Sequence, residues 1–242
     1  MDANVQRERF GSRFASVSFG SALLRRFACY AMVLGLALAA FAQPGSGVAR
    51  IAARVDAHYG HLRSLQTDFS ETYTGAGITR NESGTLWLKR PGRMRWEYRE
   101  PRKKLFLTDG KTAWFYVPGE KQARQTPLRK LAGIQSPFAY LLGHTKLEKE
   151  FAGLSPAPDA PAENPGDAVL RGVLRGASGL TQVLMEIAPD GRFVRLEIVG
   201  EDGSVTRFRF SNQRENVPVP PESFHFSPPA GVETIAGDIG NN

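Results

Sequence analysis

Cysteine is almost absent from this 242-residue sequence, in which Cys29 is the only one. It lies inside an N-terminal segment that we expect to be removed, so the mature chain would contain none. Disulfide bonds, thiol catalysis and cysteine-ligated metals are therefore excluded for the mature domain. A lipid anchor on cysteine is excluded as well, since Cys29 lies at the start of the apolar run, the wrong place for lipoprotein processing.

The sequence also lacks an apolar run long enough for a comfortable membrane span, which needs about 20 residues. Its most apolar stretch, residues 27–41, follows a flank with five arginines and ends in Ala40–Ala42, a small-x-small cleavage pattern. This order predicts a secretory signal peptide over residues 1–42 rather than an uncleaved anchor. Arg25 and Arg26 hint at twin-arginine export, but the residues after them fit that motif poorly, which favours the general secretory route.

Without the signal peptide, the chain has no large net charge of either sign. The chain has 31 basic and 24 acidic residues, and the signal accounts for five and two of them. Residues 43–242 therefore carry a net charge of only +4 and are long enough for one domain with a sizeable core. Export to the periplasm argues against nucleic acid as a partner, and we expect a soluble monomer.

Residues for catalysis or metal binding are scarce. There are four histidines, and a metal site needs several ligands close together. His58 and His61 lie three apart and are expected at the surface, while His144 and His225 are in distant segments. No Ser/His/Asp pattern or carboxylate pair stands out, so the sequence predicts no enzyme, no metal and no cofactor.

The spacing of apolar residues predicts one helix over residues 46–66, after which the period changes from helical to two. We expect a last short strand near residues 224–229, short helical pieces at 128–132 and 137–142, and an Ala/Pro-rich loop at 155–166 whose role is open. The other predicted strands are 67–73, 85–89, 93–99, 105–108, 112–117, 121–126, 168–174, 181–187, 193–199 and 205–211. Nine to eleven strands with few helices favour an antiparallel sheet that curls on itself.

The strands carry apolar residues on one face and charged residues on the other, because alternate residues share a face. Leu86, Leu88 and Arg90 share one face, and Arg93, Arg95 and Arg99 are expected on the opposite one. The apolar face needs a cover. From pattern alone an ordinary packed core is favoured over an open apolar cavity, since interiors are close-packed.

Several motifs occur together along the chain. Residues 84–91 read GTLWLKRP, residues 94–98 read MRWEY, and residues 108–116 read TDGKTAWFY. Ser136-Pro137-Phe138 precedes Leu141-Leu142, and residues 224–232 read FHFSPPAGV. Together they resemble the periplasmic outer-membrane lipoprotein carrier family, LolA, over most of residues 46–234. Serine stands where the family's lid motif has threonine, and the third quarter matches by pattern only.

The resemblance implies an α+β, mostly β fold: an unclosed antiparallel β-barrel with a helical lid over a hydrophobic cavity. It implies a periplasmic chaperone that takes acylated lipoproteins from an inner-membrane ABC transporter, LolCDE. Delivery would be to an outer-membrane acceptor, LolB, which is lipid-anchored. Which lipoproteins are carried, and whether a separate acceptor exists, stays open.

The resemblance also implies roles for particular residues. Arg90 matches the family's latch arginine, which bonds to the lid backbone, although the hairpin position alone favours an arginine that points to water. The lid segment comprises Pro137, Phe138, Leu141 and Leu142. The acyl-chain cavity candidates are Leu86, Leu88, Met94, Trp96, Tyr98, Trp114, Val194, Leu196, Ile198, Phe208 and Phe210.

Two other interpretations remain at this level. The basic run over residues 89–104 could meet lipid headgroups or could be a solvated sheet face, and the tryptophans Trp87, Trp96 and Trp114 could line a site or simply pack. For the whole chain, the alternatives are a related lipid-binding or lipid-sensing envelope protein and, with no catalytic group to support it, a periplasmic hydrolase.

Overall fold

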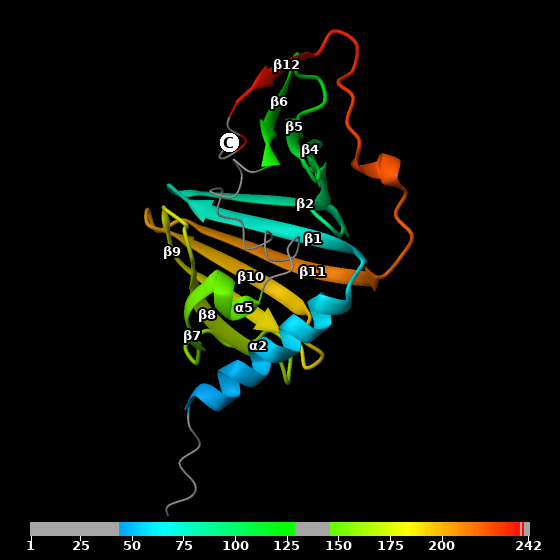
Figure 1. Ribbon diagram of the computed structural model, residues 1–242. Coiled ribbons are helices and arrows are strands. Elements are labelled where there is room, and N and C mark those ends of the chain that lie inside the picture. The colour runs from blue at the N-terminus through cyan, green and yellow to red at the C-terminus, as the bar shows by residue number, and fades with distance from the viewer. Residues whose placement is uncertain (1–43, 129–145, 238, 240–242) are drawn as a thin grey trace, which may run out of the picture. The chain divides into compact units, whose positions relative to one another are not determined.

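A single large sheet dominates the computed structural model (Figure 1), which describes residues 44–128, 146–237 and 239. The strand order is β12-β6-β5-β4-β3-β2-β1-β11-β10-β9-β8-β7, and every neighbouring pair is antiparallel except β12 with β6. In the described residues the two edge strands β12 and β7 do not pair with each other, so the barrel is unclosed. The predicted fold class is confirmed, with twelve strands instead of nine to eleven.

Within the described residues, the helical elements with defined bounds are α2 (Pro44–His61), α5 (Leu147–Glu150) and the 3₁₀ helix η1 (Pro221–Phe224). The strands are β1 (Ser64–Gly75), β2 (Ile78–Lys89), β3 (Arg93–Glu100), β4 (Lys104–Asp109), β5 (Thr112–Tyr116), β6 (Gln122–Pro127), β7 (Phe151–Pro156), β8 (Ala168–Leu174), β9 (Leu180–Ile187), β10 (Phe193–Gly200), β11 (Val205–Glu215) and β12 (Glu233–Ala236).

Several predicted elements and boundaries were wrong. The first helix ends at His61, and Leu65 belongs to β1 instead, where it pairs with Leu88. Residues 224–229 form no strand, because proline lacks the N–H that a ladder needs. Strand β7 was missed, since its Gly153 and Pro156 read as loop residues. The helical pieces predicted within residues 128–142 lie outside the described residues, apart from Leu128.

Helix α2 packs on one face of the sheet, here called the inner face, and the opposite face is called the outer face. The helix buries Val48, Ala52, Val55 and Tyr59 in one cluster with the inner-face side chains, and Leu62, the first residue after the helix, joins the same cluster. The backbone N–H of Phe193 donates to the Tyr59 hydroxyl at 3.0 Å, and the two rings stack at 5.2 Å. A buried stripe at helical spacing therefore fixes α2 across the strands.

The turn before β10 approaches α2 so closely that only glycine fits. Gly191 has a φ of +93°, and a Cβ there would lie 2.6 Å from the carbonyl oxygen of Arg54. A side chain would need both a rare backbone conformation and a shift of the helix. The sequence Pro189-Asp190-Gly191, predicted as a turn, thus also sets the distance between α2 and the sheet.

Candidate functional site

The inner face gathers most of the cavity candidates into one apolar surface. Leu86 pairs with Trp96 and Leu88 pairs with Met94 between β2 and β3, while Leu196 pairs with Phe208 between β10 and β11. The inner-face candidates in the buried cluster are Leu86, Leu88, Met94, Trp96, Leu196, Phe208 and Phe210, and Tyr98 and Ile198 pack against it partly buried. Strand parity therefore placed these residues correctly.

Two candidates lie elsewhere. A β-bulge between Phe193 and Arg195 makes Val194 the extra residue of β10, and Phe193 takes the inner, buried position instead. Trp114 pairs with Leu107 on β4, which pairs with Arg95 on β3, so the indole shares the outer face with Arg95. Both corrections have one cause. The alternation of faces along a strand cannot be extrapolated past a bulge, or past a turn whose register is unknown.

The outer face is apolar around Trp114, contrary to the expectation of a charged surface there. The Trp114 and Tyr116 rings lie 5.4 and 5.5 Å from the Phe226 ring, and Phe224 is 2% exposed. The segment that follows β11 covers this part of the sheet (Figure 1). The FHFSPP motif is therefore a strap on the outer face and not an additional strand.

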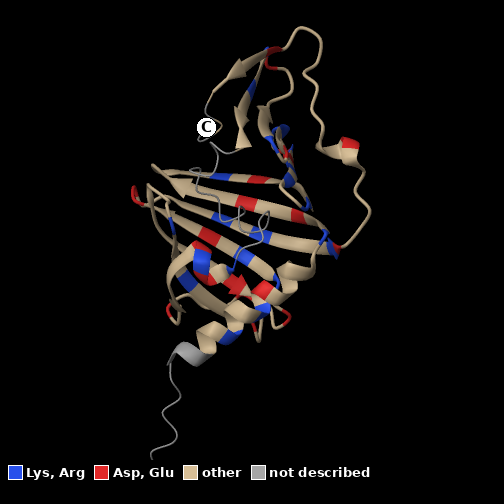
Figure 2. Cartoon of the chain, viewed as in Figure 1, with Lys and Arg blue, Asp and Glu red and all other residues tan. Residues whose placement is uncertain are grey.

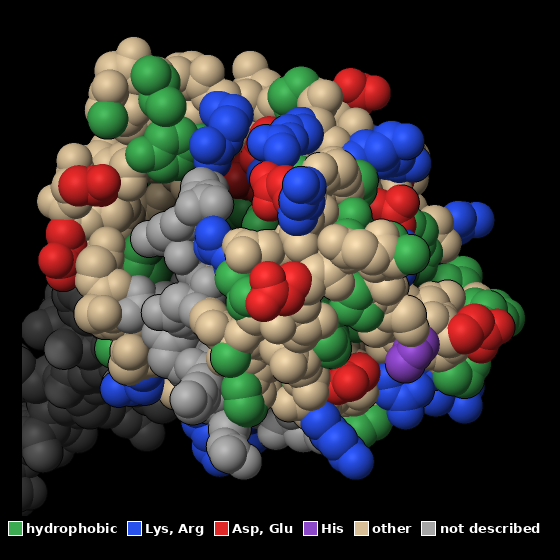
Figure 3. Space-filling model, turned by 90° about the horizontal axis from the view of Figure 1, so that it is seen from above, with side chains coloured by type: hydrophobic (Ala, Val, Ile, Leu, Met, Phe, Trp, Pro, Cys, Tyr) green, Lys and Arg blue, Asp and Glu red, His purple; other side chains and the backbone are tan. Residues whose placement is uncertain are grey.

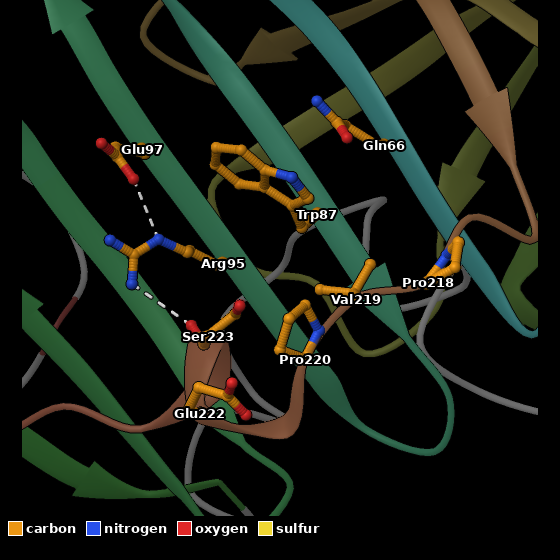
Figure 4. Close-up of a pocket in the computed structure, with 9 residues that line it drawn as sticks. All are labelled: Gln66, Trp87, Arg95, Glu97, Pro218, Val219, Pro220, Glu222 and Ser223. Atoms are coloured by element: carbon orange, nitrogen blue, oxygen red, sulfur yellow. Dashed lines mark hydrogen bonds and ion pairs between the residues drawn. The ribbon is translucent and has the colours of Figure 1, made fainter.

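A groove of about 410 Å³ lies on the outer face beside this strap. Figure 4 shows Trp87 and Arg95 pointing into it from β2 and β3, opposite Val219 and Pro220. The Arg95 guanidinium donates to Glu97 at 2.9 Å and to the carbonyl oxygen of Ser223 at 3.2 Å. The groove is thus separated from the inner face by the sheet itself.

The basic run over residues 89–104 does not form a free cationic patch. Lys89 donates to the carbonyl oxygen of Val219 at 2.6 Å, and the acidic partners of Arg95, Arg99, Arg102 and Lys104 are Glu97, Asp68, Glu120 and Glu82. Basic and acidic bands also lie side by side along the central strands (Figure 2), and blue and red side chains lie near one another on the face in Figure 3. The solvated-face interpretation fits the pairings of Arg95, Arg99 and Arg102 better than a headgroup site, whereas Lys104 lies on the inner face beside Tyr98.

Arg90 follows β2 directly, beside the end of α2. Its backbone N–H donates to the carbonyl oxygen of Arg63 at 3.0 Å. With Tyr59, Leu62 and Leu88 it lines a small hollow of about 10 Å³. Arg90 therefore lies on the Leu88 side of the sheet, as parity predicts, and it is half-buried.

The predicted lid residues Pro137, Phe138, Leu141 and Leu142 lie outside the described residues. The chain resumes at α5, where the backbone N–H of Leu147 donates to the Asp56 carboxylate at 2.8 Å. Leu147 is completely buried in the core cluster. The segment that returns from the lid positions is thus anchored to α2 by a hydrogen bond and an apolar side chain.

Sequence reasoning missed a charged group on the inner face. Glu71 and Glu82 are direct cross-strand partners, and both are buried. The Tyr98 hydroxyl donates to Glu71 at 2.7 Å, and the Lys104 ammonium lies 2.6 Å from Glu82. In the sequence, the one sign of this charged group is that Glu71 shares a strand face with Phe69. The polar first half of β2 was not predicted as a strand, so Glu82 could not be placed on the same face.

The pKa of Glu71 is raised, first by burial and then by the neighbouring Glu82 carboxylate, although Tyr98 and Lys104 oppose the shift. The folded state therefore binds this proton more tightly than the unfolded chain does. The resulting stabilisation is fully present below the unfolded pKa of about 4.3 and is lost as the pH rises through the folded pKa.

Glu71→Gln, which imitates the protonated form, should therefore be more stable than wild type at about pH 8, with the difference closing toward about pH 4. Thermal unfolding across that range measures it. Glu97→Gln on the outer face, where the carboxylate is half-exposed and paired with Arg95, serves as the control for removing a carboxylate charge that is not buried. A gain for Glu71→Gln that is equal at every pH would contradict the burial argument.

Within the described residues, no three His, Cys, Asp or Glu side chains gather closely enough to hold a metal ion. No helix among those residues combines the length and apolarity needed to cross a membrane.

The fold and the inner face define a class: an open β-barrel protein with an apolar surface on one side of its sheet, partly covered by a helix. Residues 60–227 match the family model of the outer membrane lipoprotein carrier protein LolA. The chain belongs to this family.

Two relatives agree with that assignment, and one solved structure shares the fold. The chain is 33% identical over 214 residues to the outer-membrane lipoprotein carrier protein of Chromobacterium violaceum, covering 86% of this chain and 96% of the relative. It is 34% identical over 180 residues to the protein of that name from Nitrosospira multiformis, covering 73% and 84%. An uncharacterized conserved protein from Thermus thermophilus shares the fold with a TM-score of 0.50 at 13% identity, covering 79% of this chain and 99% of that one.

Proposed function

We propose that this protein is a periplasmic carrier that binds the acyl chains of lipoproteins on the inner face of its sheet and delivers them to the outer membrane. The observation that carries the proposal is the apolar inner face, built by residues from at least seven strands in a member of the lipoprotein carrier family. No chemical step is assigned to the protein, so its work is binding and release.

Binding must be coupled to a conformational change. The inner-face side chains are buried here against α2 and one another, so acyl chains can reach them only when part of the cover moves. Burying acyl chains gains about 0.8 kcal/mol per CH₂, which is too much for rapid exchange if several chains are fully buried. The cost of opening offsets part of that gain and keeps release feasible.

The partners follow from this role. An inner-membrane transporter of the LolCDE type would load the carrier, and a LolB-like acceptor would unload it. The energy for loading would come from the transporter, since the sequence contains no nucleotide-binding motif. Arg90 and the lid residues 137–142 would set the balance between the closed, empty state and the open, loaded state.

Binding of an environment-sensitive hydrophobic dye tests the carrier function directly. The lipid-free domain should bind the dye, and a triacylated lipopeptide should displace it, because both use the inner face. Fluorescence titration measures both steps. If neither the dye nor the lipopeptide binds, the inner face is an ordinary packed core and the proposal is wrong.

Processing of the N-terminus gives a second test. We expect the mature chain to begin at Gln43 and to be soluble without detergent, because Ala40–Ala42 forms the cleavage pattern and no cysteine follows it. N-terminal sequencing of protein from the periplasm measures this. An intact Met1 or a lipid-modified terminus would contradict the expected export.

A further inference from the structure

Aromatic side chains form a continuous row on the inner face. The Trp96 ring lies 5.6 Å from Phe208 and 4.9 Å from Phe69, and the Phe69 ring lies 5.0 Å from Tyr98. The row joins β11, β1 and β3, and it ends at the Tyr98 hydroxyl, which donates to Glu71. The inner face therefore changes from apolar to charged at a defined place.

Five side chains form the charged end, here called the polar cluster: Glu71, Glu82, Tyr98, Lys104 and Arg80. Glu71 is 8% and Glu82 is 7% exposed. The Lys104 Nζ lies 2.6 Å from a Glu82 oxygen and 4.2 Å from the centre of the Tyr98 ring, and the Arg80 Nε lies 3.6 Å from the same carboxylate. The cluster thus holds positive and negative groups in contact.

The polar cluster lies between the aromatic row and the exposed strand ends. Leu65 pairs with Leu88 near the end of α2, and Glu71 pairs with Glu82 six residues further along β1. Beyond the cluster the pairing runs out to Gly75 with Ile78, and Ile78 is 55% exposed. Along these two strands the surface is apolar near α2, charged in the middle and open to water at the turn.

The charges of the polar cluster restrict the ligand that it could take. Two carboxylates beside one another disfavour a phosphate group, and Lys104 and Arg80 disfavour a cationic headgroup. A neutral group with both carbonyl oxygens and N–H groups matches, because Lys104 and Arg80 can donate while the carboxylates and the Tyr98 oxygen can accept. Esters and amides have this chemistry.

We propose that the polar cluster binds the neutral ester and amide linker of an acylated peptide while the acyl chains lie along the aromatic row toward α2. This inference rests on the proposed carrier function and adds an orientation to it. The peptide then leaves the protein at the β1–β2 turn.

A paired replacement tests the proposal without leaving a buried charge alone. Glu82→Leu with Lys104→Met removes both partners of the ion pair, an exchange that proteins often tolerate. The matched control is Glu197→Leu with Arg207→Met, which removes a pair of 2.6 Å on the outer face of β10 and β11. Each variant is titrated with a diacylglyceryl-cysteine peptide, with 1-hexadecanol and with phosphatidylglycerol.

The linker site predicts that the Glu82/Lys104 variant binds the lipopeptide about tenfold more weakly than wild type while hexadecanol binding is unchanged. The control pair should change neither affinity. Tyr98→Phe, which removes one hydroxyl, should weaken lipopeptide binding by a smaller factor and serves if the double variant does not fold.

Three outcomes would overturn the proposal. An unchanged ratio of lipopeptide to hexadecanol affinity means that the cluster does not touch the linker. An equal loss in the control pair means a general effect on the sheet. A larger loss for phosphatidylglycerol than for the lipopeptide means a phosphate site. If wild type binds no lipopeptide at all, the proposed function itself fails, which is a distinct result.

Discussion

Arg90→Leu should still load lipoprotein from the inner membrane but should retain it roughly thirtyfold longer when acceptor is offered. Arg90 lies beside the end of α2 on the Leu88 side of the sheet. If its guanidinium stabilises the closed, empty state, leucine removes those donors and makes that edge more apolar. If the free energy that favours the closed state falls by about 2 kcal/mol, retention rises about thirtyfold. Release into acceptor-bearing outer membranes measures it.

Arg90→Lys separates the charge of this residue from its hydrogen-bonding geometry. Lysine keeps the positive charge but not the planar fork of donors, so an intermediate release rate is expected. Arg63→Leu, at an exposed position near the same end of α2, controls for loss of charge in this region. If Arg90→Leu releases lipoprotein normally and is as stable as wild type, the latch role is wrong and Arg90 is an ordinary hairpin arginine that points to water.

Glu186→Ala should destabilise the protein by about 3–5 kcal/mol, because it breaks a buried charged network. Glu186 is completely buried and accepts the backbone N–H groups of Glu163 and Asn164 at 2.7 and 3.1 Å. Its other oxygen lies 2.9 Å from Arg195, which also donates to the carbonyl oxygen of Pro161 at 3.1 Å. Thermal unfolding should show a Tm lower by roughly 6–20 °C.

Glu163→Ala is the matched control for this network. Its side chain is 31% exposed, pairs with Arg209 at 2.6 Å and lies 3.3 Å from Arg195, and the Arg209 hydrogen bond lowers the pKa of Glu163. Its backbone N–H still donates to Glu186, so we expect a cost of no more than about 1 kcal/mol. Equal losses for both variants would mean that the buried carboxylate has no special role.

The same network holds the Ala/Pro-rich loop, whose role could not be predicted from the sequence. The loop had no periodic pattern, and nothing in it predicted a partner. In the structure its backbone at Pro161, Glu163 and Asn164 is held to the outer face of β9 and β10 by Glu186 and Arg195. Contacts of this kind depend on residues more than twenty positions apart, which local patterns cannot reveal.

Strand pattern predicted the inner face well where strands were regular and failed at irregularities. Leu86, Leu88 and Trp96 were placed correctly because period-two alternation determines the face. Val194 was misplaced by a bulge and Trp114 by the register across the β4–β5 turn. Neither a bulge nor a register leaves a clear trace in local sequence.

The charged end of the inner face could not be predicted for a different reason. The first half of β2, residues 78–83, is polar and gave no strand signal, so Glu82 was not placed opposite Glu71. Charge on an inner face also contradicts the usual pattern of burial. Such conflicts between local preference and position occur most often at functional sites.

Photo-crosslinking at two adjacent positions of β10 tests the central claim that acyl chains bind the inner face. Ile198 packs against the inner cluster, and Val199, the next residue, belongs to the outer face. A photoreactive residue is placed at one or the other position in the mature protein, which is then loaded with a triacylated lipopeptide. We predict capture of the acyl chain at position 198 and little at 199. Equal capture at both positions, or capture at 199 alone, would contradict the account.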